Sequence, residues 1–417
     1  MMIWREGVVR RLGRAWPGAA ELEVEVTDGA SAAAGDPVAA TGVPATGVPA
    51  TGVPAAGVPV TAGPAGPVPA GTTVRALAYP SLVGEPAPGD RVLLSAAALA
   101  RGLGTGGYAM VVALPDRLPA DPAPGPGHLV KARYTPLQTL VLGADEQESE
   151  HHEVLRDADD LAGLPVVVAD LHSALPAVVA GVRAAWSGTT APRVVYVMTD
   201  GGALPAWFSR ALAGLREAGW LAGSVTVGQA FGGDLEAVSL HSGLLAARLV
   251  LAADVVVVAQ GPGNLGTGTR WGFSGTVCGD AVNAVVALGG QAVASLRVSG
   301  ADPRERHLGV SHHSLTAYGR VALAPADVVV PRFDDALAAA LPGRLAERID
   351  DQVAGLVAPV GIHRLVEVPT DGLLEALAGS PVALSTMGRG LDADPAAFVA
   401  AAVAGVHAAR VAGRPVR

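Results

Sequence analysis

The segment that most constrains the fold runs from 254 to 276 and reads DVVVVAQGPGNLGTGTRWGFSGT. It opens with a continuous apolar run, which is typical of a strand buried on both faces of a parallel sheet. The run ends abruptly in a glycine-rich loop. Ligands of open α/β sheets bind at the carboxyl ends of the strands, so this loop predicts a binding site at that edge.

Further segments repeat this arrangement of an apolar run, a polar loop and a helical pattern. They cover residues 165–170, 193–202, 224–234 and 291–302. Strands that alternate with helices indicate an α/β domain, and right-handed crossovers bring the strand ends to one edge of the sheet. We therefore predict a three-layer α/β domain with a mainly parallel, Rossmann-like sheet and converging loops.

The N-terminal part has a different pattern. Residues 5–26 alternate in polarity around a turn at Pro17-Gly18, and residues 72–99 continue the alternation, which predicts a small β-barrel domain over residues 1–120. A five-residue repeat, TGVPA, begins at Thr41 and is too rich in Gly and Pro to pack, so we expect a disordered insertion over 29–71. Residues 121–127 form the expected linker, and residues 128–417 the α/β domain.

Composition excludes several partners. The chain has 417 residues and a net charge of -9, which argues against binding to nucleic acid or to an anionic membrane, since both need clustered Lys and Arg. The most apolar stretch, 244–259, is interrupted by Arg248 and Asp254, so no transmembrane helix is expected. A single cysteine, Cys278, forms no intrachain disulfide, and we expect a buried thiol there. The N-terminus lacks a signal-peptide pattern, which predicts a cytoplasmic protein. Oligomeric state cannot be read from these features.

The glycine-rich loop offers backbone N–H groups, hydroxyls, an amide and a guanidinium, which together suit an anionic group. Its spacing is neither that of a P-loop nor GxGxxG, so neither a nucleoside triphosphatase nor a dinucleotide fold is supported. A tight turn that uses glycine only for backbone geometry is the alternative. The candidate ligand-binding residues of this loop are Gly261, Gly263, Asn264, Gly266, Thr267 and Arg270.

Lys131 is the single lysine of the chain, in HLVKARYTPLQ. If this segment is a strand, Lys131 and Arg133 share one face and form a second anion contact. A pair of solvated cations on an edge strand is the alternative interpretation.

Two of the other strand ends carry groups suited to proton transfer. Asp170 and His172 are two residues apart, as in a metal-ligand pair or an oriented acid-base histidine, and Ser173 follows them. Helix capping by Ser173 and a solvent-facing His172 is the alternative. Thr199 and Asp200 end the next strand, and there Asp200 is a candidate base, metal ligand or hydroxyl clamp.

Glycines and short polar side chains complete this set. Gly201 and Gly202 would allow a ligand to approach closely, and Gln229, Asp234 and Glu236 lie near a further helix start. Carboxylates at a helix start also complement its dipole, which is the alternative reason for Asp234 and Glu236. The catalytic candidates are therefore Asp170, His172, Asp200 and Asp234.

Histidines suggest a metal site less directly. His312 and His313 are adjacent, and adjacent side chains diverge in regular structure, so the pair needs an irregular backbone to bind one ion. The cluster of His151, His152 and Glu153 lies in an acidic loop and is a weaker candidate. The candidate ligands of a divalent metal are Asp170, His172, His312 and His313, while the cofactor itself stays undetermined. The GxSxG motif of serine hydrolases is absent.

Six of these segments together resemble the bacterial protein family DUF3866. They are HLVKARYTPLQ, VVVADLHSALP, VMTDGGALPAWFSR, VGQAFGGDLEAV, GPGNLGTGTRWGFSG and SHHSLTAYGRVALAPADVVVP. The resemblance covers nearly the whole chain except the TGVPA repeat. It implies no activity, substrate or cofactor, and so it assigns no residue a role.

Two functions fit these observations. The first is an enzyme that acts on a small anionic metabolite, phosphorylated or nucleotide-like, by hydrolysis or group transfer at the carboxyl edge of the sheet. Hydride transfer fits less well because the Rossmann fingerprint is missing. The alternative is a non-catalytic protein that binds or senses a metabolite in the same pocket.

Overall fold

A computed structural model describes residues 2–29, 68–103, 106–358 and 361–413 of the chain. These residues form two compact units, Met1–Pro124 and Gly125–Arg417, and each is described by itself. The repeat segment predicted as an insertion lies for the most part, at 30–67, outside the described residues.

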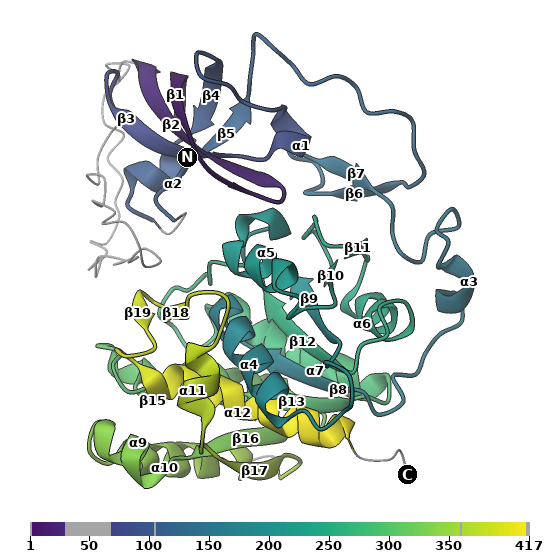
Figure 1. The fold of residues 1–417 in the computed structure, drawn as a ribbon, viewed down its shortest axis with the longest axis vertical. Coiled ribbons are helices and arrows are strands. Elements are labelled where there is room, and N and C mark those ends of the chain that lie inside the picture. The colour runs from purple at the N-terminus through teal and green to yellow at the C-terminus, as the bar shows by residue number, and fades with distance from the viewer. Residues whose placement is uncertain (1, 30–67, 104–105, 359–360, 414–417) are drawn as a thin grey trace. The chain divides into compact units, whose positions relative to one another are not determined.

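The first unit is a closed barrel with strand order β1-β2-β3-β5-β4 (Figure 1). Alternating apolar residues such as Val24, Val92 and Leu94 point inward and form its core. Val68 is also buried there and accepts a hydrogen bond from Arg5, so the barrel resumes before the predicted end of the insertion at residue 71. Its elements are β1 Trp4–Trp16, β2 Ala19–Gly29, β3 Thr73–Ala78, α1 Pro80–Val83, β4 Arg91–Ser95, α2 Ala97–Ala100 and β5 Ala109–Ala113.

The second unit is built on an eight-stranded parallel sheet with the order β11-β10-β9-β12-β8-β13-β16-β17. The central strands are almost wholly buried because both faces are covered, which explains their unbroken valine runs. This architecture confirms the predicted fold, a barrel followed by a Rossmann-like α/β domain. The strands are β8 Pro165–Ala169, β9 Val194–Thr199, β10 Gly223–Thr226, β11 Leu235–Glu236, β12 Val255–Gln260, β13 Gln291–Ser295, β16 Asp327–Arg332 and β17 Arg364–Pro369.

Helices cover the two faces of this sheet. On one face α4 (Leu175–Ala185) packs against α12 (Pro395–Ala412), while α6 (Leu240–Leu249) and α7 (Val277–Ala287) lie together on the other (Figure 1). Glycines bring α4 and α12 into close contact, because a Cβ at Gly181 would lie 1.9 Å from the carbonyl oxygen of Ala402. In the described part of the chain, α12 is the one helix long and apolar enough to span a membrane. However, 78% of its 18 residues are buried inside the protein, as in a core helix.

Further elements complete the second unit. Five of them carry residues of the candidate site: the 3-10 helices η3 Ser274–Thr276 and η4 Glu305–His307, the helix α8 His312–Thr316, and the two strands of a hairpin, β18 Ser385–Thr386 and β19 Arg389–Gly390. The others are β6 Leu129–Lys131, β7 Thr139–Val141, α3 His152–Leu155, η1 His172–Ala174, η2 Ala206–Phe208, α5 Arg210–Glu217, β14 Val298–Ser299, β15 Gly309–Val310, the π-helix η5 Ala317–Val321, α9 Asp335–Ala340, α10 Leu345–Val357 and α11 Leu373–Ala378.

The strand order creates a crevice at the carboxyl edge. After β8 the chain continues to β9, toward the β11 end of the strand order. After the neighbouring strand β13 it continues to β16, toward the β17 end. Where connections diverge in this way the loops separate, and open α/β folds bind their ligands there. Residues that follow β8 and β13 are therefore expected to form the site.

Candidate functional site

The centre of this crevice is the carboxylate of Asp170, which directly follows β8 and is buried. Its Oδ2 accepts a hydrogen bond from Arg297 Nη1 at 3.2 Å and lies 3.0 Å from His313 Nδ1. Its Oδ1 accepts a bond of 3.0 Å from the amide of Asn264. Four segments of the chain, including the glycine-rich loop and the ends of β8 and β13, thus meet at one side chain.

Asp170 is held in its charged form. Burial alone would raise the pKa of Asp170, but the hydrogen bond from His313 and the charge of Arg297 outweigh it, and the pKa lies below its ordinary value. The close approach of η3 depends on a glycine, because a Cβ at Gly275 would lie 1.7 Å from Asp170 Oδ1. The glycine after the loop is therefore required by packing against the carboxylate.

Three histidines form a cluster beside Asp170. His307 belongs to η4, while His312 and His313 are the first two residues of α8, which Ser311 caps. One ring nitrogen of each histidine lies within 4.8 Å of those of the other two. The expectation that the adjacent pair diverges is wrong, because their ring centroids are only 4.5 Å apart. Phe273 from the glycine-rich loop stacks on the His313 ring at 3.8 Å.

Two of the three histidines, His307 and His312, are neutral and have positive neighbours. Burial, reinforced by the charges of Arg297 and Arg304, lowers the pKa of His307 to about 2. Burial and the charges of His313 and Arg306 lower the pKa of His312 to about 4. Neutral imidazoles have a free lone pair, which is the form that binds a metal ion. Among the described residues, His128, Glu146 and Glu148 form a second group with this spacing, but two of these three side chains are exposed.

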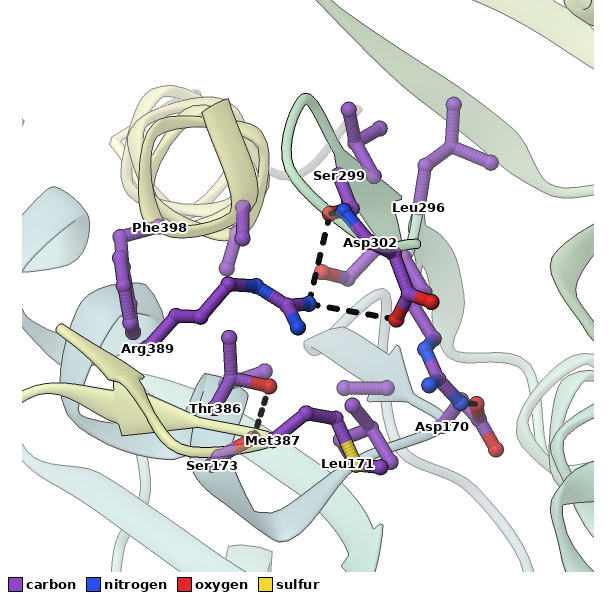
Figure 2. Close-up of a pocket in the computed structure, with 17 residues that line it drawn as sticks. Asp170, Leu171, Ser173, Leu296, Ser299, Asp302, Thr386, Met387, Arg389 and Phe398 are labelled. Carbon is purple, nitrogen blue, oxygen red and sulfur yellow. Dashed lines mark hydrogen bonds and ion pairs between the residues drawn. The ribbon is translucent and has the colours of Figure 1, made fainter. Parts of the chain in front are cut away.

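A small cavity lies next to Asp170 and is lined in part by the β18–β19 hairpin (Figure 2). Its lining includes Asp170, Ser173, Arg297, Thr386 and Arg389, and its volume of about 30 Å³ suits one water molecule. The Ser173 hydroxyl donates to Thr386 at 3.1 Å. Ser173 is therefore bonded to the hairpin and does not cap α4, whose N-cap is Ala174.

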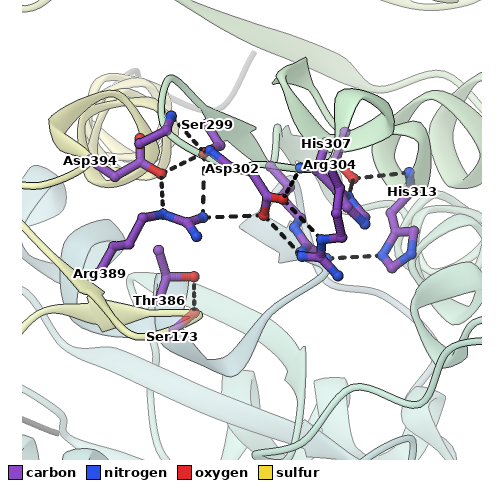
Figure 3. Close-up of polar contacts among 12 residues, drawn as sticks. Ser173, Ser299, Asp302, Arg304, His307, His313, Thr386, Arg389 and Asp394 are labelled. Carbon is purple, nitrogen blue, oxygen red and sulfur yellow. Dashed lines mark hydrogen bonds and ion pairs between the residues drawn. The ribbon is translucent and has the colours of Figure 1, made fainter. Parts of the chain in front are cut away.

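A polar network joins this hairpin to the segment that carries His307 (Figure 3). Arg389 donates to the buried carboxylates of Asp302 and Asp394 at 3.2 and 3.1 Å. Arg304 binds the same Asp302 with two bonds of 2.9 Å. Ser299 donates to Asp394 at 2.5 Å. Side chains far apart in sequence thus fix residues 299–307.

His172 does not join the Asp170 cluster. Its ring lies between the Tyr196 hydroxyl, 3.0 Å from Nδ1, and the Ser209 hydroxyl, 2.6 Å from Nε2. Burial lowers its pKa to about 4. The predicted Asp170–His172 pair is therefore separated, because the chain turns into η1 after the strand and the two side chains take different partners. These bonds occupy both ring nitrogens of His172, so it is unavailable to a metal.

The residues predicted at the ends of β9 and β10 form a second group. Asp200 accepts a hydrogen bond from the backbone N–H of Gln229 at 2.9 Å, and the Gln229 side chain accepts one from the backbone N–H of Arg133. Gly201 and Gly202 pack against Gln260 and Gly261 rather than facing open space. Thr199 Oγ1 is buried without a hydrogen-bond partner among the described atoms, as is Oε1 of Gln260, its neighbour on β12.

Three predicted residues lie away from the crevice. Lys131 is 2% exposed and donates to the carbonyls of Ala230 and Ala237, 3.5 Å from Glu236, so it is not a free anion contact. Because β6 ends at Lys131, the exposed Arg133 does not share a strand face with it. Asp234 binds Arg216 and the backbone N–H of Ser224 near the amino end of β10, the opposite edge of the sheet from Asp170.

The glycine-rich loop before α7 is closed by hydrogen bonds between its own residues. The N–H of Thr267 donates to the carbonyl of Gly272, and the N–H of Leu265 donates to the Ser274 hydroxyl, so these amides are not free for an anion. Gly263, Gly266, Thr267 and Arg270 are exposed. From this loop Asn264 donates to Asp170, and Phe273 stacks on His313.

Sequence reasoning missed two central residues, Arg297 and Arg389. Arg297 lies two residues after the end of the apolar strand β13, and that position is a signal for it. His307 lies in the polar stretch before His312, where no motif marks it. Arg389 had no local signal, because its partners Asp302 and Asp394 are brought to it by the fold.

Comparison with curated proteins and with solved structures gives no match. The family model described as a protein of unknown function, DUF3866, matches residues 75–405, from the third strand of the barrel to the last helix. The match includes every residue of the Asp170 cluster and the histidine cluster. On this evidence the chain belongs to the DUF3866 family.

Proposed function

We propose that this protein is an enzyme that binds a small anionic metabolite, phosphorylated or nucleotide-like, in the crevice between β8 and β13 and transforms it by hydrolysis or group transfer. One observation carries the proposal. Asp170, Asn264, Arg297 and His313 come from four separate segments and form one bonded cluster at the point where the strand connections diverge.

A buried charged cluster is costly to build, which supports a role beyond folding. Desolvation penalises Asp170 and Arg297, and an apolar core of the same volume would be at least as stable. Groups of this kind in a crevice are frequent in active sites. The cluster therefore favours a chemical role for this edge of the sheet.

The surrounding charge favours an anionic substrate. The positive charges of Arg297 and Arg304 contribute to the lowered pKa of His307, and that of Arg306 contributes to the lowered pKa of His312. Arg306 Nη2 also lies 3.9 Å from the position of a Cβ on Gly268, beside the glycine-rich loop. Positive groups at the mouth of a site raise the local concentration of anions.

The test is turnover by the purified full chain and by Asp170→Asn. The probes are p-nitrophenyl phosphate, a nucleoside monophosphate and a nucleoside diphosphate, each followed for phosphate release and product formation. Because Asn removes the charge that orients His313 and Arg297, we expect Asp170→Asn to lower turnover by about 10²-fold or more.

Asp254→Asn is the matched control. Asp254 accepts a hydrogen bond from the N–H of Arg193 at the amino end of β12, so its loss should leave turnover intact. Equal turnover by wild type and Asp170→Asn contradicts the proposal. A compound that stabilises the protein and is recovered unchanged indicates the metabolite-binding alternative.

A further inference from the structure

We propose that His307, His312 and His313 bind one divalent transition metal ion of the zinc class, with Asp170 as the residue that positions His313. The inference deepens the proposed function because it gives the same crevice a metal centre. Metal binding itself stands on the histidine geometry alone and is tested without activity.

The spacing of the three rings fits one ion. A Zn–N bond of about 2.0–2.1 Å plus the distance from nitrogen to ring centre places tetrahedrally arranged imidazole centroids about 5 Å apart. The centroids of His307 are 5.0 Å from His312 and 5.1 Å from His313, and those of His312 and His313 are 4.5 Å apart. One ring nitrogen of each histidine lies within 4.8 Å of those of the other two, so small movements of the rings bring the three nitrogens to bonding distance from one ion.

In His307 and His313 the hydrogen bond lies at Nδ1, which leaves Nε2 as the nitrogen for an ion. His307 Nδ1 is 2.7 Å from the Ser311 hydroxyl, and His313 Nδ1 is 3.0 Å from the Asp170 carboxylate. A carboxylate partner fixes the proton on Nδ1 and leaves the lone pair on Nε2, as it does for most metal-bound histidines.

Arg297 competes for the same His313 nitrogen. Its Nη1, which can only donate, lies 3.0 Å from His313 Nδ1. An ion on Nε2 of His313 requires the proton on Nδ1, and this selects Asp170 over Arg297 as the partner. Metal binding and the Asp170–His313 bond therefore support each other.

His312 supplies an independent observation. Its Nε2 is buried and has no hydrogen-bond partner among the described residues. A buried polar atom without a partner costs about 1–3 kcal/mol, and native proteins rarely leave one without a reason. A bound metal ion supplies the missing partner.

Ligand chemistry selects the class of metal. Three imidazole ligands suit zinc and the neighbouring divalent transition metals, whereas Mg²⁺ and Ca²⁺ prefer oxygen ligands. Three protein ligands leave a further coordination position, as in catalytic zinc sites. When bound, such an ion lowers the pKa of a coordinated water or polarises a substrate oxygen. The positive charge of Arg297 is offset by Asp170, with which it forms a buried ion pair.

The experiment uses the tag-free full chain, stripped of metal with a chelator and titrated with Zn²⁺ against a chromophoric competitor. Wild type should bind one Zn²⁺ per chain at this site. His312→Gln should weaken this binding by at least about 100-fold, and Asp170→Asn by about 10- to 100-fold. His241→Gln, which changes an exposed histidine on α6, is the matched control and should bind as wild type does.

A second measurement needs no variant. Co²⁺ added to the metal-free wild type should give the visible absorption bands of a tetrahedral nitrogen-rich site, and Zn²⁺ should abolish them. Failure to bind one equivalent of Zn²⁺, or equal affinity of wild type and folded His312→Gln, overturns the metal site. Turnover without zinc binding would retain the proposed enzyme and reject its metal, whereas zinc binding without turnover would do the reverse.

Discussion

At the scale of single residues, the neighbours of Asp170 and His172 show why two side chains two positions apart have different roles. Asp170 remains at the end of the sheet and takes charged partners, whereas His172 turns into η1 between two hydroxyls. The sequence predicted that both lie at a strand end, because the apolar run stops there. It could not predict that they separate, because Tyr196 and Ser209 reach His172 only through the packed fold.

His172 gives a testable pH dependence. Its folded pKa, about 4, is below its ordinary value of 6.5, so the unfolded chain takes up a proton in this interval and the folded chain does not. The free energy of unfolding should therefore fall as the pH is lowered from about 6.5 to about 4, by roughly 3 kcal/mol from this residue. Urea denaturation at pH 7 and pH 4.5 measures it on metal-free protein.

His172→Gln is the comparison, since it retains polar atoms but does not titrate. The loss of stability between the two pH values should be about 2 to 3 kcal/mol smaller in this variant than in wild type. His307 and His312 contribute equally to both proteins and cancel. Identical losses in the two proteins would show that His172 is not buried and neutral.

At the scale of secondary-structure elements, the segment 299–307 and the β18–β19 hairpin depend on each other. The sequence predicted the parallel strands well, because each is a short apolar run that ends in a polar loop. It predicted that Asp234 and Glu236 lie near a helix start, but Glu236 belongs to β11, and α6 begins at Leu240 after a cap at Ser239. The network through Arg389 was beyond prediction, since Asp302 and Asp394 have no fixed spacing from it.

Arg389 should stabilise this pair of elements strongly. Nearby arginines and backbone bonds outweigh burial and hold the pKa of Asp302 below its ordinary value, so the carboxylate is charged. Arg389→Met leaves the buried Asp394 and Asp302 with less compensation, and we expect a loss of about 3–5 kcal/mol in urea denaturation. Because the segment carries His307, zinc affinity should fall as well.

Arg344→Met is the matched control for that experiment. The Arg344 side chain is 86% exposed and forms a surface pair with Glu347, so its loss should leave the free energy of unfolding close to that of wild type. A similar small cost for Arg389→Met would contradict the anchoring role of the network.

At the scale of the whole molecule, the sequence predicted the two architectures because they have different patterns. Alternation with tight turns indicated the barrel, and strands alternating with helices indicated the parallel sheet. The strand order was not predictable, because a crossover pattern alone does not say on which side of β8 each later strand is added. The crevice between β8 and β13, and with it the histidine cluster, follows from that order.

The repeat segment should be dispensable for the barrel. The flanking strands pair by themselves, with Glu25 opposite Thr73, and Gly71 donates to the carbonyl of Val26. Replacing residues 31–66 with a short Gly-Ser turn removes no described contact and shortens the loop that must close. We expect the melting temperature to stay within a few degrees of wild type. A larger decrease, measured by thermal denaturation, would show that the repeat contributes to folding.

Anomalous diffraction at the zinc edge, from crystals of the full chain grown with Zn²⁺, tests most directly whether the crevice binds a metal ion. We predict a strong peak about 2.0–2.1 Å from one ring nitrogen of each of His307, His312 and His313, with Asp170 bonded to His313 behind it. Zinc found only elsewhere, for example at His128 and Glu146, would contradict the assignment of this edge of the sheet as a metal-dependent active site.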